Sequence, residues 1–144
     1  MLASVLMCVV LVVSDGDSLT VRCGDSAAAG PLRVRVAEID APELRQAFGQ
    51  RARQQLASLC RGQRARIDVR ARDAYGRTVA AVACQGEDVA QVQVRSGLAW
   101  VAPGYAKGDT RLLALQEAAR RERIGLWSRP RPTPPWVYRH RRAL

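Results

Sequence analysis

A basic strand that runs into an acidic turn, RVRVAEIDAPE, occupies residues 33–43. Arginine and valine alternate at its start, and this two-residue period predicts a β-strand over residues 32–39. The proline near its end keeps the preceding residue extended, so the chain leaves the strand without turning into a helix. One cation, Arg35, and two carboxylates, Asp40 and Glu43, are therefore expected at the rim of a sheet. Phosphate chemistry uses such a set: an anion-binding cation, a metal ligand and a base held in fixed relation.

The composition predicts a polyanionic partner. The chain has 144 residues, enough for one domain with its own core. Its formal net charge is +10, from 23 basic residues against 13 acidic ones, and its isoelectric point is about 10.9. Lys107 is the only lysine, so arginine carries the positive charge, and its forked guanidinium binds phosphate oxygens in pairs. A compositional bias toward arginine explains part of this excess, yet nucleic acid fits it better than a merely soluble surface.

Several kinds of site are excluded or disfavoured by residue types that are scarce. His140 is the only histidine, which argues against histidine-dependent nucleases and Ser-His-Asp hydrolases. The four cysteines have no Cys-x-x-Cys spacing, so a zinc site has no support. Aromatic residues make up 5% of the chain. A barrel that binds single strands by base stacking needs more of them.

The N-terminal residues are apolar apart from Ser4, as far as Val13. This run is shorter than the ~20 residues that cross a bilayer. It also lacks the basic start and the small-residue cleavage site of a complete signal peptide. We interpret residues 1–7 as the remnant of an export signal, or as a start site placed too late, and residues 8–13 as the first core strand. An exported protein, periplasmic or secreted, without a stable membrane span is the expectation.

The middle of the chain is predicted to alternate short strands with helices. Strands are expected at residues 19–23, 65–70 and 78–84, and helices from Gln46 to about Cys60 and from Asp109, as N-cap, to about Ile124. The range 88–96 is ambiguous, because its valines favour a strand whereas Asp88 as N-cap and Gly97 as a stop favour a short helix. No internal repeat is found, and the pattern predicts an α+β, barrel-like domain.

The C-terminal residues 129–144 are rich in proline and arginine. They contain too few apolar residues to fold alone, so we expect an extended tail that ends in a basic cluster. Trp136 and Tyr138 are its candidates for docking on the domain, which we place at residues 8–128.

Six short phrases resemble, in order and spacing, those of the staphylococcal (micrococcal) nuclease or thermonuclease family. They are Asp15-Gly16-Asp17-Ser18, Arg33-Val34-Arg35, Ile39-Asp40-Ala41-Pro42-Glu43, Asp73-Ala74-Tyr75-Gly76-Arg77, Gly97-Leu98-Ala99-Trp100 and Gly125-Leu126-Trp127. The resemblance covers roughly residues 8–128. It implies an α+β fold, a five-stranded OB-type β-barrel with about three packed helices, and it favours a helix for the ambiguous range 88–96.

The resemblance also implies a calcium-dependent endonuclease that hydrolyses phosphodiester bonds of DNA and RNA. The implied Ca²⁺ ligands are Asp17, Asp40 and the backbone carbonyl of Ala41. The implied catalytic residues are Arg35 and Arg77 on the scissile phosphate and Glu43 as the base for the attacking water. The implied substrate contacts are Tyr75 and Tyr105. Calcium prefers oxygen ligands of this kind, and two arginines match the charge that develops on phosphate oxygens.

Four positions depart from the family pattern. Ala41 replaces a usual threonine, which a carbonyl ligand tolerates, and Ala74 replaces a lysine, so one phosphate contact is missing. Pro103 stands where another tyrosine is found, and Glu38 where a small residue is common. The alternative is a catalytically silent barrel of the same shape that binds nucleic acid or protein, although such domains generally lose the acidic and arginine positions kept here. We expect a monomer.

Cys60 and Cys84 are predicted to lie near the same end of the sheet. Cys60 ends a helix just before one predicted strand, and Cys84 ends the strand that returns beside it. A disulfide between them is the first expectation if the protein is exported. Two separate buried thiols, or a pairing with Cys8 or Cys23, are the alternatives.

Overall fold

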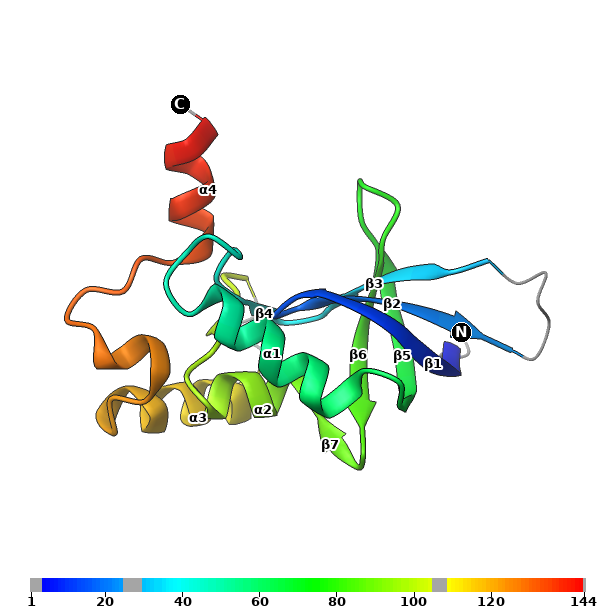
Figure 1. Cartoon of the computed structure of the whole chain (residues 1–144). Coiled ribbons are helices and arrows are strands. Elements are labelled where there is room, and N and C mark those ends of the chain that lie inside the picture. Colours follow the sequence, from blue (N-terminus) through cyan, green and yellow to red (C-terminus); the bar gives the residue numbers. More distant parts are fainter. Residues whose placement is uncertain (1–3, 25–29, 105–108, 144) are drawn as a thin grey trace.

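The computed structural model describes residues 4–24, 30–104 and 109–143. Its regular elements are, in chain order, β1 (Ser4–Asp15), β2 (Ser18–Cys23), β3 (Leu32–Val36), β4 (Ile39–Asp40), α1 (Gly49–Cys60), β5 (Arg64–Arg72), β6 (Thr78–Cys84), β7 (Glu87–Asp88), α2 (Val89–Arg95), β8 (Trp100–Val101), α3 (Thr110–Arg121), a 3-10 turn (Gly125–Ser128) and α4 (Pro135–Ala143). Figure 1 shows their arrangement.

Five strands close into a barrel. β1 lies between β2 and β5 and pairs with both in antiparallel register. The hairpins β2–β3 and β5–β6 extend the sheet on either side, and a parallel pairing of β3 with β6 closes it. Alternate residues point inward, and Val10, Val21, Val34, Ile67 and Val82 are almost wholly buried. The α+β, OB-type barrel expected from the sequence is thus confirmed.

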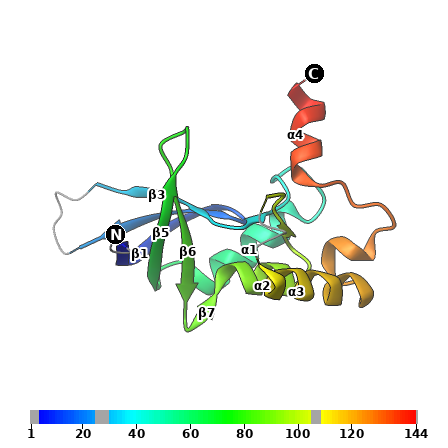
Figure 2. The same cartoon turned by 180° about the vertical axis from the view of Figure 1, so that it is seen from behind.

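The first three helices gather at one side of the barrel (Figures 1 and 2). α1 packs against β1, and α2 packs against α1, α3 and β6. Asp88 caps α2 by accepting a hydrogen bond from the Gln91 amide at 3.0 Å, so the ambiguous range 88–96 is helical. Asp109 caps α3 in the same way, through the Leu112 amide. Among the described helices, none has the length and apolar character needed to cross a membrane.

Several element boundaries differ from those predicted; α3, for example, ends at Arg121 and not near Ile124. α1 begins at Gly49 and not at Gln46, because Phe48 takes a left-handed conformation with φ of 68°. The strand expected over residues 32–39 is interrupted at Glu38, whose φ is 75°, a conformation that favours small residues. β1 begins at Ser4, so residues 4–7, interpreted above as an export remnant, pair with β5.

The expectation of an extended C-terminal tail is wrong for its last part, which forms helix α4. Pro135 is its first residue, a position that tolerates the missing amide hydrogen, and it is buried. Trp136 docks on the domain as expected, with its ring 5.5 Å from that of Trp100. Figures 1 and 2 show α4 (red) projecting on the same side as the turn between β5 and β6. Tertiary contacts, and not local composition, stabilise this short helix.

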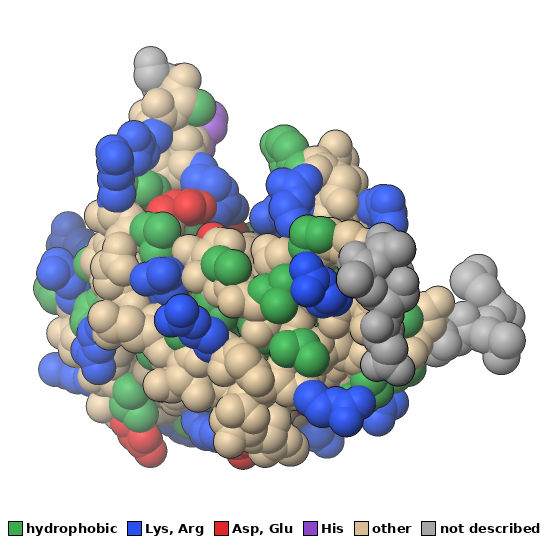
Figure 3. Space-filling view, turned by 45° about the vertical axis from the view of Figure 1, so that its right-hand side comes forward, with side chains coloured by type: hydrophobic (Ala, Val, Ile, Leu, Met, Phe, Trp, Pro, Cys, Tyr) green, Lys and Arg blue, Asp and Glu red, His purple; other side chains and the backbone are tan. Residues whose placement is uncertain are grey.

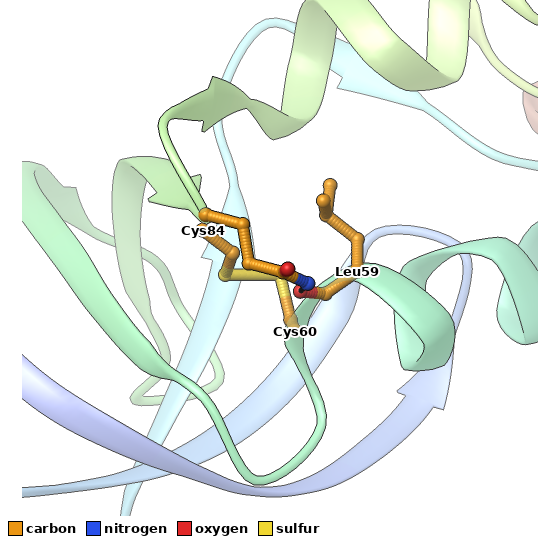
Figure 4. Close-up of a disulfide and its surroundings, with 4 residues drawn as sticks. Leu59, Cys60 and Cys84 are labelled. Atoms are coloured by element: carbon orange, nitrogen blue, oxygen red, sulfur yellow. Dashed lines mark hydrogen bonds between the residues drawn. A yellow bond between two sulfur atoms is a disulfide. The ribbon is translucent and has the colours of Figure 1, made fainter.

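Two disulfides link the four cysteines. Cys60 and Cys84 are joined as predicted, with Cα atoms 5.4 Å apart, and Figure 4 shows the bond between the end of α1 and the end of β6. Leu59, beside it, accepts a hydrogen bond from the Gln85 side chain at 2.8 Å. Cys8 and Cys23 form the second bond, between the paired strands β1 and β2. The first bond therefore ties α1 to the barrel, and the second links two neighbouring strands of its wall.

Candidate active site

A cleft of about 530 Å³ lies between α4 and the β5–β6 turn. Figure 3 shows a hollow there, with acidic atoms (red) at the foot of α4 and basic atoms (blue) on both sides. The cleft is lined by Asp15, Asp17, Arg33, Arg35, Asp40, Ala41, Glu43, Tyr75, Arg77 and Arg139. The structure therefore brings together seven of the eight site residues predicted from the sequence. The eighth, Tyr105, lies outside the described residues.

The turn between β1 and β2 carries the first carboxylate of the site. Gly16 approaches the 39–41 segment so closely that a Cβ atom there would lie 2.7 Å from that of Ala41. Gln93 of α2 donates to the Gly16 carbonyl at 2.7 Å, and Asp15 Oδ1 accepts the Asp17 amide at 3.0 Å. These contacts fix Asp17, which is 5% exposed and accepts the Ala41 amide at 2.6 Å. Asp15 thus stabilises the turn, which leaves Asp17 for the site.

Arg35 lies between two buried carboxylates. Its Nη1 is 3.3 Å from Asp17 Oδ2, and its Nη2 is 3.4 Å from Asp40 Oδ1. Nη1 also donates to the carbonyls of Val36 and Ile39, both at 2.9 Å. The broken strand explains these last bonds, because the turn at residues 37 and 38 leaves both carbonyls beside the guanidinium. The position of Arg35 is therefore set by backbone as well as by charge.

The two buried carboxylates form a donor set that fits a hard cation. Burial raises the pKa of Asp17 to about 8, against the opposing effect of Arg35. Asp40 is also only 5% exposed. Carboxylate oxygens, together with a backbone carbonyl such as that of Ala41, are ligands that Ca²⁺ prefers. Within residues 4–24, 30–104 and 109–143, three or more His, Cys, Asp or Glu side chains do not converge as a metal site. The candidate set needs only two, with the carbonyl.

The opposite wall of the cleft is the turn between β5 and β6. Asp73 accepts the Arg77 amide at 2.9 Å and the Arg77 Nε at 2.7 Å, so this turn orients its own arginine. The Arg77 guanidinium lies 5.8 Å from the centre of the Tyr75 ring. Tyr75 is 77% exposed, and its backbone carbonyl accepts a hydrogen bond from Arg33 Nη2 at 2.7 Å. An exposed ring beside a fixed guanidinium is suited to contact with a nucleotide.

Arg139 of α4 is the site residue that sequence reasoning missed. Its Nη2 donates to Asp40 Oδ2 at 2.7 Å, and its Nη1 donates to Asp40 Oδ1 at 3.1 Å and to Glu43 Oε1 at 2.7 Å. The bonds to Asp40 and Glu43 raise the pKa of Arg139 above its ordinary value. Its place in a basic cluster next to Trp136 was the available signal. Because residues 129–144 were predicted to form an extended tail, Arg139 was not expected to reach the barrel.

The loop that carries Glu43 is also tied to the C-terminal segment. Gln46 Oε1 accepts the Glu43 amide at 3.0 Å, and Gln46 Nε2 donates to the Thr133 carbonyl at 2.6 Å. Glu38, by contrast, lines a separate small cleft with Asp109. Burial and a hydrogen bond to Asp109 raise the pKa of Glu38. Its charge is therefore outside the candidate active site.

Comparison with known proteins gives a consistent result. The family model described as staphylococcal nuclease homologue matches residues 33–129. The chain is 41% identical over 131 residues to an "uncharacterized endonuclease" of Escherichia coli O157:H7, covering 90% of this chain and 82% of that protein. It is 37% identical over 137 residues to a "micrococcal nuclease" of Shigella flexneri, covering 88% and 76%. A match of this extent, on a closed barrel with this cleft, places the chain in the staphylococcal nuclease homologue family.

Proposed function

We propose that this chain is a calcium-dependent endonuclease that hydrolyses phosphodiester bonds of DNA and RNA. The observation that carries the proposal is the convergence of Arg35 and Arg77 with the carboxylates of Asp17, Asp40 and Glu43 on one cleft. Relatives named endonuclease and micrococcal nuclease support the same class of reaction.

The two arginines would bind the scissile phosphate from opposite walls of the cleft. Arg35 is fixed on the barrel side by its bonds to carbonyls and carboxylates, and Arg77 is fixed on the turn side by Asp73. Because both are held in advance, little reorganisation is needed when charge grows on the phosphate oxygens in the transition state. Such preorganised donors account for a large part of the rate in phosphoryl chemistry.

Glu43 would accept the proton of the attacking water. Its side chain is 36% exposed and lines the same cleft as the two arginines. Asp17, Asp40 and the Ala41 carbonyl would hold Ca²⁺, which supplies positive charge next to the phosphate. The base then needs no histidine, in agreement with a chain whose only histidine, His140, does not line this cleft.

The exposed surroundings of the cleft would bind the nucleic acid. Tyr75 and Arg33 lie at its rim, and Tyr105 is proposed as a second nucleotide contact. The net charge of +10 favours a polyanion over long range. We also propose that the protein acts after export, supported by the disulfides Cys8–Cys23 and Cys60–Cys84, since such bonds persist in oxidising compartments.

A plasmid-nicking assay tests the proposal. With Ca²⁺ the wild type should convert supercoiled plasmid to nicked circles, and chelator should stop the conversion. The Arg77→Ala variant is the matched control. It should cut the plasmid far more slowly and still fold, because the Arg77 side chain is not part of the core. A wild type that binds the plasmid without cutting it under any calcium concentration would favour the silent, nucleic-acid-binding barrel instead.

A further inference from the structure

Arg139, a side chain of α4, is hydrogen-bonded to two carboxylates on which the proposed function depends, those of Asp40 and Glu43. Arg139 bonds to both carboxylate oxygens of Asp40 and to one of Glu43. Asp40 Oδ1 is in addition 3.4 Å from the Nη2 of Arg35. Both oxygens of Asp40 and Oε1 of Glu43 are therefore bonded to guanidinium groups.

We propose that α4 is an autoinhibitory strap, in which Arg139 competes with the divalent cation for Asp40 and Glu43. The inference rests on the proposed function and adds its regulation. A guanidinium and a calcium ion both need the negative oxygens of these side chains, and Arg139 donates where the cation would be held. In the closed arrangement the same arginine also bonds to Oε1 of Glu43, the proposed base. Cation binding and a free base therefore both require Arg139 to withdraw.

The attachment of α4 is weak enough to be reversible. The helix has nine residues, and Pro135 is the one among them that is buried. The Arg139 side chain remains 47% exposed, so water can compete for its guanidinium, although the Asp40 side chain that it pairs with is only 7% exposed. A helix this short is marginal once it leaves the surface that it packs on.

Other contacts also hold the C-terminal segment, and one of them reaches the loop of Glu43 through Gln46. Trp136 packs edge-on against Trp100, and the Thr133 carbonyl accepts the Gln46 side chain. Prolines at 130, 132 and 134 stiffen the connection to the barrel. The strap can therefore withdraw as a unit, and Trp136, whose ring leaves that of Trp100, reports on the withdrawal.

Calorimetric titration of Ca²⁺ into the full chain is the first test. Arg139→Ala should bind Ca²⁺ about tenfold more tightly than the wild type, the gain expected if the closed form is populated about nine times in ten. Arg141→Ala is the matched control, since it removes the same charge from the same helix, and within the described residues Arg141 makes no ion pair or side-chain hydrogen bond. Its affinity should equal that of the wild type.

Quenching of tryptophan fluorescence by acrylamide is the second test, because a purely electrostatic effect of Arg139 would not move α4. Ca²⁺ should increase quenching in the wild type, and Arg139→Ala should show the higher quenching before any Ca²⁺ is added. In Trp136→Phe the calcium-dependent change should become smaller, since Trp100 and Trp127 stay on the barrel body and only the uncovering of Trp100 remains to be detected.

The outcomes separate the two proposals. Equal Ca²⁺ affinity in the wild type and Arg139→Ala, or weaker binding in the variant, overturns the strap and leaves the calcium site standing. Quenching that does not respond to Ca²⁺ in the wild type also overturns the strap. If wild type and Arg139→Ala both fail to bind Ca²⁺, the calcium assignment itself is wrong, and the strap fails with it.

Discussion

Arg35 Nη1 lies 3.3 Å from Asp17 Oδ2, and their side chains are only 18% and 7% exposed. The pair joins the strand β3 to the β1–β2 turn inside the wall of the cleft. Among the described residues, the ion-pair partner of Arg77 is Asp73 in its own turn, at side-chain exposures of 29% and 21%. The two phosphate-binding candidates therefore differ in what they do for the fold, and mutations should reveal the difference.

Arg77→Ala should lower the cleavage rate by roughly 10³ and leave the free energy of unfolding unchanged within error. Arg35→Ala should lose a similar rate and, in addition, roughly 2–3 kcal/mol of stability, because Asp17 loses its cationic partner and Asp40 keeps only Arg139. Single-turnover kinetics and urea unfolding measure the two effects. Turnover near the wild-type rate in either variant contradicts its role on the phosphate.

Asp40→Ala and Glu43→Gln should separate metal binding from proton transfer. Loss of Asp40 removes a proposed ligand and should weaken Ca²⁺ binding together with activity. Glu43→Gln keeps the size of the side chain and removes the base, so the rate should fall by at least about 10² while Ca²⁺ affinity is retained or increased. Calorimetry of both variants gives the comparison. An equal loss of affinity in the two would make Glu43 a ligand and not the base.

Stability without calcium should fall as the pH rises from about 4 to about 8. Burial raises the pKa of Asp17 to about 8 from an ordinary value of 3.8, so over this range the folded chain retains a proton that the unfolded chain has lost. The free energy of unfolding then decreases with pH, by at most about 1.4 kcal/mol per pH unit. Asp17→Asn should make this slope much smaller and be more stable than the wild type at pH 8. Urea unfolding in chelator at several pH values measures it. A wild-type stability that rises with pH contradicts the assignment.

Replacement of Cys60 and Cys84 together by alanine should cost roughly 3 kcal/mol of stability, because the bond closes a loop with a sequence separation of 24. Activity should be retained at low temperature, since neither cysteine lines the active cleft. The Cys8 and Cys23 double variant is the control for a bond between adjacent strands. Mass mapping of non-reduced peptides checks the pairing directly, and a peptide that links Cys60 to Cys8 or Cys23 would show it to be wrong.

The local sequence alone determined much of the site. The alternation that ends at Asp40-Ala41-Pro42, the Asp-Gly turn before Ser18 and the turn ending at Arg77 are short patterns whose backbone geometry is set by the residues themselves. Order and spacing then identified the barrel and seven of the residues that line the cleft. The Cys60–Cys84 bond could also be expected, because an antiparallel return of two strands fixes which ends meet.

Only the tertiary structure decided the features that depend on packing at a distance. The local sequence of the range 88–96 is compatible with either period, the family resemblance favours a helix, and burial of Val89 and Val94 beside the barrel accounts for it. Helix α4 has only nine residues and too little intrinsic stability to be predicted from its sequence. Contacts of Trp136 and Arg139 with the folded domain provide the additional stability. The basic cluster that contains Arg139 does not by itself predict a bond to Asp40, 99 positions earlier in the chain. A contact of that kind exists only after the barrel has closed.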